Sequence, residues 1–182
     1  MSVGRPPPSP LPVPDRPGVR SAPAVASSGL ISTPATDWKR PESVLVLVCT
    51  RAGEVLLMER TRPHGFWQSV TGSLRWGEQP AAAAARELAE ETGLEAAGTR
   101  LRDLRHEACF PIVPPWRARY AASVRYNREH WFLLELPQRR TIHLNPAEHR
   151  QYRWLDAASA ARRASSWTNR KLIRLWAADR RL

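Results

Sequence analysis

The chain lacks the features that mark disulfide-stabilised, zinc-thiolate and membrane-spanning proteins. Only two of its 182 residues are cysteines, Cys49 and Cys109, and they are too far apart for a CxxC motif. We therefore expect two buried thiols with no disulfide, zinc site or redox role. No segment approaches the roughly 20 apolar residues of a membrane span, and prolines and charges interrupt any apolar core of a secretory signal. These absences predict a cytoplasmic protein without a membrane segment.

Acidic residues are also scarce, with 17 Asp and Glu against 28 Lys and Arg and a formal net charge of +11. An excess of this size attracts polyanions such as nucleic acids or phosphorylated small molecules. The arginines are spread along the whole chain and form no RNA-binding signature. We therefore expect a small polyanionic substrate and no nucleic-acid partner, and the sequence does not indicate an oligomeric state.

The N-terminal region differs in composition from the rest of the chain. Residues 1–36 contain the proline-rich string PPPSPLPVPDRPG and no aromatic residue. Such a segment buries too little apolar surface to order itself, so we expect a disordered tail. Residues 37–182 are expected to form one folded domain, because 42% hydrophobic residues are sufficient for a core.

Hydrophobic runs bounded by turn residues predict a series of strands interrupted by helices. The expected strands are 43–50, 54–60, 67–71, 101–110, 130–136 and 152–155. A helix is expected from Pro80, which suits a first turn, through an alanine run to a stop at Gly93. Asp156 is expected to cap a helix over 157–164, and Ser166 or Thr168 to cap the last helix. That last helix carries an apolar stripe of Leu172, Ile173, Leu175 and Trp176.

The most informative segment is residues 72–94, GSLRWGEQPAAAAARELAEETGL. It follows the pattern G-x5-E-x7-R-E-U-x-E-E-x-G-U, in which U is aliphatic. On the expected helix Glu87 lies three residues before Glu90 and four before Glu91, so the three carboxylates share one face. Magnesium prefers oxygen ligands, usually carboxylates together with water and substrate phosphates. The spacing therefore predicts a magnesium site that acts on a phosphate chain.

This pattern is the Nudix box, and the chain resembles the Nudix hydrolases, which cleave nucleoside diphosphates linked to another group. The resemblance implies an α/β fold, the Nudix α/β/α sandwich with a mixed β-sheet, and a Mg²⁺ cofactor with Mn²⁺ as a substitute. It implies a catalytic role for Arg86, Glu87, Glu90 and Glu91. The metal would be held by Glu87, Glu90, Glu91 and the carbonyl of Gly72, with Arg86 orienting the carboxylates through a forked hydrogen bond.

Further strings are similar to one branch of that family, the dihydroneopterin triphosphate diphosphatases of bacterial folate synthesis. They are KRPESVLVLV, FWQSVTGS, RYNREHWF, YRWLD and SWTNR. By position this resemblance implies that Glu148 completes the metal site. It also implies a substrate-binding group of Lys39, Arg60, Thr71, Phe110, Pro111, Ile112, Val113 and Ser166. His149, beside Glu148, is expected to be solvated.

The branch resemblance predicts magnesium-dependent hydrolysis of 7,8-dihydroneopterin triphosphate to the monophosphate and pyrophosphate. The motif itself does not distinguish the group attached to the phosphates, so ordinary or oxidised nucleoside triphosphates remain an alternative substrate class. A non-catalytic ligand sensor or RNA-binding module is a second alternative. Such modules commonly lose glutamates of the motif, whereas this chain keeps all of them.

Overall fold

The computed structural model describes residues 38–96, 101–114 and 116–179. The expected tail, residues 1–36, lies outside the described residues, so the division into tail and domain stays a prediction. Within the described part no helix is both long and apolar enough to cross a membrane.

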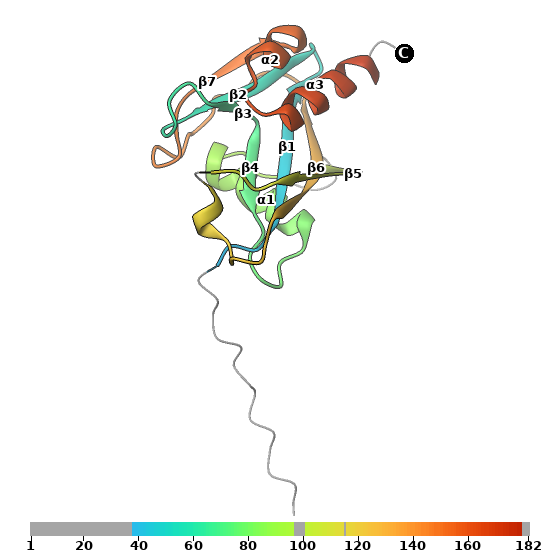
Figure 1. Cartoon of the computed structure of the whole chain (residues 1–182). Coiled ribbons are helices and arrows are strands. Elements are labelled where there is room, and N and C mark those ends of the chain that lie inside the picture. The colour runs from blue at the N-terminus through green and yellow to red at the C-terminus, as the bar shows by residue number, and fades with distance from the viewer. Residues whose placement is uncertain (1–37, 97–100, 115, 180–182) are drawn as a thin grey trace, which may run out of the picture. The chain divides into compact units, whose positions relative to one another are not determined.

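Strand β1, Glu42–Thr50, is the centre of a seven-stranded mixed sheet (Figure 1). One edge of β1 pairs in parallel with β6, Tyr126–Leu136, from Arg128 to Leu136. The first half of the other edge pairs antiparallel with β4, Val70–Ser73. The end of that edge meets β2, Glu54–Arg60, at the pair Cys49 and Val55. Because β1 has partners along both edges, the rest of the sheet is assembled around it.

The outer strands extend the sheet in two directions. Strand β5, Leu101–Pro111, pairs antiparallel with β6. Strand β2 pairs antiparallel with β3, Trp67–Gln68, and with β7, His149–Asp156. A short 3-10 helix, η2, Trp116–Arg119, lies in the connection between β5 and β6. These pairings bring the start of β7 close to the end of β2, since Arg60 pairs with His149.

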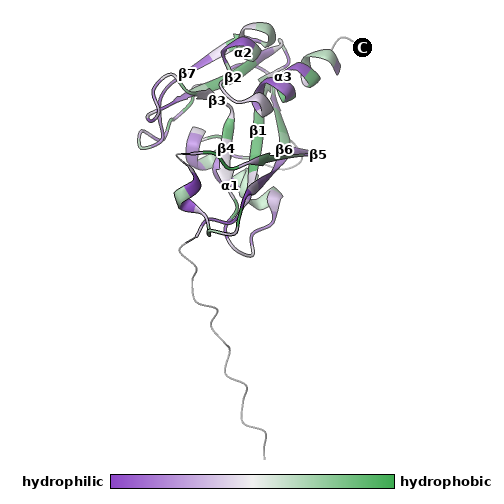
Figure 2. Cartoon of the chain, viewed as in Figure 1, coloured by the Kyte–Doolittle hydropathy of each residue, from purple (hydrophilic) through white to green (hydrophobic). Residues whose placement is uncertain are grey.

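Helices cover both faces of the sheet. Helix α1, Pro80–Thr92, packs through Leu88 against alternate residues of β1 and β6 on one face. Helices α2, Ala157–Arg163, and α3, Trp167–Asp179, cover the other face. Figure 2 shows β1 as a continuously hydrophobic strand, as a strand buried on both faces requires. The expected α/β/α sandwich with a mixed sheet is confirmed.

The helix boundaries follow from local signals that the sequence already contains. Pro80 occupies the first turn of α1, and Gly93 ends it in the left-handed conformation, with φ of 69°. The side chain of Asp156 accepts a hydrogen bond from the Ser159 backbone N–H and caps α2. The Ser166 hydroxyl accepts one from the Asn169 backbone N–H, so Ser166 and not Thr168 caps α3.

Several expectations need correction. The strand expected at 67–71 is two strands, because the chain leaves the edge of β2 at Ser69 and joins the edge of β1. There the Ser69 backbone N–H donates to the Asn169 side chain at 2.7 Å instead of to a strand. Strands β6 and β7 begin earlier than expected, because their first residues are mostly polar and form no hydrophobic run, although Asn127, Glu129 and His149 among them are buried. Leu175 is exposed and does not belong to the buried stripe, and Cys109 is exposed whereas Cys49 is buried.

Glu129 of β6 is a charged residue inside the layer between the sheet and α3. Its side chain accepts a hydrogen bond from Trp131 Nε1 at 3.0 Å, and the residue is 5% exposed. Burial raises the pKa of this carboxyl to about 7, against the weaker effect of hydrogen bonds from Trp131 and Thr168. The folded protein therefore favours the protonated form more strongly than the unfolded chain does.

Glu129 should make the stability of the protein depend on pH. Below its unfolded pKa of 4.5 the carboxyl is protonated in both states, and its contribution is fully present. As pH rises through the folded pKa of about 7, that contribution is lost, about 3 kcal/mol in total. The free energy of unfolding of wild type and Glu129→Gln should be measured in urea at pH 4.5 and pH 8. Relative to the wild type, the variant should be more stable at pH 8 than at pH 4.5, by about this amount. A pH-independent difference between the two proteins would contradict the assignment.

Candidate active site

Gly72 allows strand β4 to approach helix α1 closely. A Cβ atom at this position would lie 1.8 Å from Cδ of Glu87, which is far inside contact distance. The carboxylate of Glu87 thus fills the space that a side chain at residue 72 would need. This explains in steric terms why the motif has a glycine there. The Gly72 backbone consequently borders the acidic face of α1.

Arg86 connects the carboxylates of the motif. Its guanidinium donates two hydrogen bonds to Glu78, at 2.8 and 2.9 Å. It donates two more, to Glu87 at 2.7 Å and to Glu90 at 3.1 Å. The expected fork is therefore present, but its two parallel bonds go to Glu78. The Arg86 guanidinium also lowers the pKa of Glu78 to about 2, so this pair stays ionised.

A second acidic group lies beside the first, where α1 meets the start of β7. Ligand atoms of Glu91, Glu148 and His149 all lie within 4.8 Å of one another. Glu91 Oε2 and His149 Nε2 are 3.3 Å apart, and both side chains are fully buried. The turn that presents Glu148 begins at Asn145, whose side chain accepts from the Ala147 backbone N–H. The structure thus brings Glu148 to Glu91, across 57 residues of sequence.

Burial sets unusual protonation preferences in this cluster. It raises the pKa of Glu91 well above its usual range, and the nearby charges of Glu148 and Glu87 act in the same direction. Burial likewise raises the pKa of Glu87, although Arg86 opposes the effect. Burial, followed by the charge of Arg60, lowers the pKa of His149. The group therefore needs positive charge to hold its carboxylates ionised.

Two predicted phosphate-binding cations lie within electrostatic reach of these carboxylates. Lys39 interacts with Glu87 and Glu148, and Arg60 with Glu91. The Lys39 ammonium donates to the Ser73 hydroxyl at 3.3 Å, and the Arg60 guanidinium lies 5.4 Å from the centre of the Trp116 ring. Burial, and then the charge of Arg119, lowers the pKa of Lys39. A cation in such surroundings favours an anionic ligand.

The remaining predicted substrate residues lie in β4, at the end of β5 and just after it, and at the N-terminal cap of α3, and the Thr71 backbone hydrogen-bonds to Glu91. Thr71 lies in β4 and its hydroxyl accepts from the Gln68 side chain at 2.9 Å. Phe110 of β5 contacts Trp167 edge-on, with ring centres 6.4 Å apart, directly after the Ser166 cap. Pro111 ends β5, Ile112 bonds the Arg125 carbonyl, and Val113 is exposed. Among the described residues no contact joins these three to the carboxylates.

His149 shows what the sequence interpretation missed. It was expected to be solvated, but it is 1% exposed and faces Glu91. It is the first residue of β7, whose expected start was three residues later. No local sequence signal identifies it, because its position is set by the register of β7 opposite Arg60 at the end of β2.

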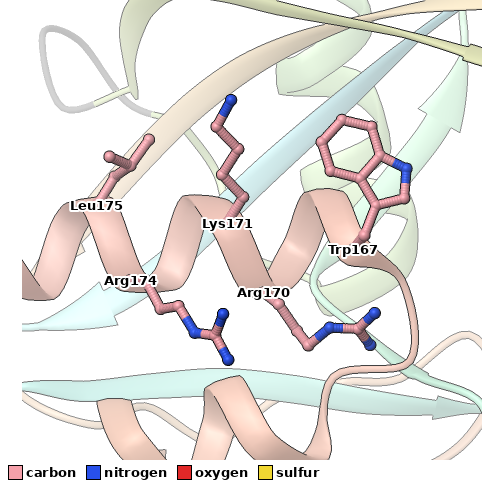
Figure 3. Close-up of a pocket in the computed structure, with 5 residues that line it drawn as sticks. All are labelled: Trp167, Arg170, Lys171, Arg174 and Leu175. Carbon is pink, nitrogen blue, oxygen red and sulfur yellow. The ribbon is translucent and has the colours of Figure 1, made fainter.

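A shallow hollow on α3 has a different character from the carboxylate cluster. It is lined by Trp167, Arg170, Lys171, Arg174 and Leu175 (Figure 3). In Figure 3 Lys171 and Leu175 extend from one side of the helix, and Arg170 and Arg174 from the other. None of these side chains is acidic, so the hollow offers no carboxylate ligand for a metal ion.

Comparisons with known proteins agree with the arrangement of this site. A family model described as the NUDIX domain matches residues 39–176. The chain belongs to the Nudix family. The dihydroneopterin triphosphate diphosphatase of Escherichia coli (strain K12) is 41% identical over 139 residues, 75% of this chain and 91% of that protein. The protein of the same name from Haemophilus influenzae is 35% identical over 140 residues, 75% of this chain and 87% of that protein.

A solved structure shows the same fold. The E. coli dihydroneopterin triphosphate pyrophosphohydrolase superposes with a TM-score of 0.72 at 40% identity, covering 78% of this chain and 98% of that one. This Nudix hydrolase fold therefore extends over nearly the whole length of its relative.

The contact at Gly72 leads to a test with an internal control. Gly72→Ala should lower thermal stability and reduce hydrolytic turnover at least about 10²-fold, because the new methyl group displaces Glu87. Adding Glu87→Ala should restore most of the stability, since it removes the side chain that clashes, but should not restore turnover. Thermal unfolding of the two single variants and the double variant measures this coupling. Additive destabilisation would show that Glu87 is not the obstacle.

Proposed function

We propose that this Nudix hydrolase uses Mg²⁺ to hydrolyse 7,8-dihydroneopterin triphosphate to dihydroneopterin monophosphate and pyrophosphate, a step in folate biosynthesis. The observation that carries the catalytic part is the group of buried Glu91 and His149 with half-buried Glu148, within electrostatic reach of Lys39 and Arg60. It combines sites for a cation and for a phosphate chain within one small region. As part of the proposal, the reaction takes place in the cytoplasm on a small molecule and not on nucleic acid.

The side chains present fit a divalent cation. Both carboxylate oxygens of Glu91 and both ring nitrogens of His149 are buried without a well-formed hydrogen bond among the described residues. Buried polar atoms normally have partners, and a cation bound at the Glu91 carboxylate would supply one. Glu87, Glu90, Glu91, Glu148 and the Gly72 carbonyl supply the oxygen atoms that Mg²⁺ or Mn²⁺ prefers. A bound metal ion would supply charge neutralisation at the phosphates and an activated water.

The residues of the chain divide the remaining work between them. Arg86 forms ion pairs with Glu78, Glu87 and Glu90, and so fixes the orientation of their carboxylates. Lys39 and Arg60 bind the phosphate oxygens and compensate their charge. A glutamate of α1 accepts the proton of the attacking water, which adds to the phosphorus nearest the pterin side as pyrophosphate leaves.

Two observations support the pterin as the head group of the substrate. Relatives that are 35–41% identical bear the name of this activity, and they match the chain over most of their own length. An aromatic pair, Phe110 and Trp167, also lies beside the polar Asn127 on β6, and aromatic walls with a few polar groups are typical of pockets for flat ligands.

Substrate preference provides the direct test. Pyrophosphate release should be measured with dihydroneopterin triphosphate and with ordinary and oxidised nucleoside triphosphates at equal concentration and fixed Mg²⁺. We expect kcat/KM to be at least tenfold higher for the pterin, about 1.4 kcal/mol of transition-state binding. A preference for nucleotides would show that the substrate is a nucleoside triphosphate, while the proposed hydrolytic chemistry would still hold. Absence of turnover on every substrate would favour a ligand sensor.

Glu91→Gln separates catalysis from folding. This change should lower turnover at least about 10²-fold, because a ligand or base is lost. Mg²⁺ should raise the melting temperature of the wild type but much less that of the variant, since bound ligands stabilise the folded state. In EDTA the variant should be at least as stable as the wild type, because it lacks a buried carboxylate. Glu95→Gln, an exposed position just after α1, is the matched control; near-normal activity of the Glu91 variant would refute the site.

A further inference from the structure

A polar group of side chains, buried at Asn127 and Glu129 and half-buried at Ser43 and Ser73, lies on one face of the sheet, and Thr168 of α3 contacts it at Glu129. Ser73, Ser43 and Glu129 are register partners across β4, β1 and β6, so their side chains point to one face. Asn127 lies two residues before Glu129 and donates to the Ser43 hydroxyl at 2.7 Å. Hydroxyl, amide and carboxyl groups thus lie side by side next to the apolar residues Leu45 and Trp131 of the same face.

This polar group has more hydrogen-bonding capacity than the described residues use. Asn127 Oδ1 and the Ser69 hydroxyl are buried and have no hydrogen-bond partner among those residues. A carboxylate can accept about four hydrogen bonds. Glu129 has two donors, Trp131 Nε1 and the Thr168 hydroxyl, and no neighbouring cation contributes to its surroundings. Hydrogen-bond acceptors without donors are therefore concentrated at Glu129 and Asn127. A ligand with several N–H donors would satisfy them.

The same polar group is bounded by aromatic rings and by a phosphate-binding cation. Phe110 is the register partner of Asn127, and it contacts Trp167 at the start of α3. At the other end Lys39 donates to Ser73 at 3.3 Å. Ser73 and Glu129 are two strand spacings apart, roughly 10 Å. A ligand with a flat ring at Glu129 and a phosphate chain at Lys39 matches this order of groups.

We propose that Glu129, assisted by Asn127, is the specificity-determining residue that recognises the ring of the substrate. It does so by accepting hydrogen bonds from two adjacent N–H donors of that ring. The ring class is a 2-aminopyrimidin-4-one, whose ring N–H and exocyclic amino group lie side by side and are shared by pterin and guanine. The carboxylate of Glu129 accepts both donors, and Asn127 Oδ1 accepts the second hydrogen of the amino group. Phe110 and Trp167 contact the face of the ring. This assignment rests on the proposed function only for the position of the substrate's phosphate chain at Lys39.

Ligands that differ by one amino group test the assignment without relying on turnover. GTP carries the 2-amino group and ITP lacks it. Dissociation constants for both should be measured in EDTA, from tryptophan fluorescence, with wild type, Glu129→Gln and the control Glu135→Gln, an exposed position on the same strand. We expect the wild type and the control to bind GTP at least about tenfold more tightly than ITP. In Glu129→Gln the preference should fall to about onefold.

A purely structural role for Glu129 gives a different pattern. Loss of α3 packing would weaken GTP and ITP equally and leave their ratio unchanged, which would overturn the assignment, as would a wild type without preference. If Glu129→Gln does not fold, Asn127→Ser takes its place and should also reduce the ratio. A Glu129-dependent GTP preference in a protein that does not hydrolyse dihydroneopterin triphosphate would support the ring assignment and reject the proposed substrate.

Discussion

The close approach of β4 and α1 at Gly72 is the constraint on which the active site depends. Because residue 72 has no side chain, the carboxylate of Glu87 lies directly against the strand, and the rest of the acidic face follows from the helical repeat. Arg86, on the same turn, then reaches Glu78 in the preceding loop. The helix and the loop are thus fixed to each other by one steric contact and one ion-pair network, and both come from a single stretch of sequence.

Charge compensation organises the region beyond that stretch. Glu87 and Glu91 are buried at a cost in free energy that Arg86 alone does not offset, since Glu91 makes no ion pair with it. Lys39, which precedes β1, and Arg60, at the end of β2, supply positive charge to the site. Burial lowers the pKa of Lys39, so its charged form is less favoured there than in water. The acidic and basic side chains of the site therefore do not fully neutralise one another. This suits a site that binds both a cation and a polyanion.

The sequence predicted those parts of the molecule that depend on local spacing. The Glu87, Glu90 and Glu91 face, the Gly93 stop and the Asp156 cap all depend on residues within one or two turns of helix, and the structure places them as expected. His149 and Glu129 were missed because their environments are created by strand register. His149 is buried only because β7 pairs with β2, and Glu129 only because α3 folds over β6. The break at Ser69 was missed for a similar reason, since Asn169 supplies its partner from 100 residues away.

The parallel pairing of β1 with β6 also has a consequence for how the protein is made. Parallel strands can pair only after a long connection has closed, and here the register partners Glu42 and Arg128 are 86 residues apart. During synthesis β1 therefore leaves the ribosome well before its principal neighbour exists, with one hydrophobic edge unpaired. The β1–β2 and β1–β4 pairings can form earlier, but the β1–β6 pairing cannot be completed until the chain has passed Leu136. Shorter nascent chains therefore carry an unpaired strand edge, the feature that makes incompletely folded chains prone to aggregation.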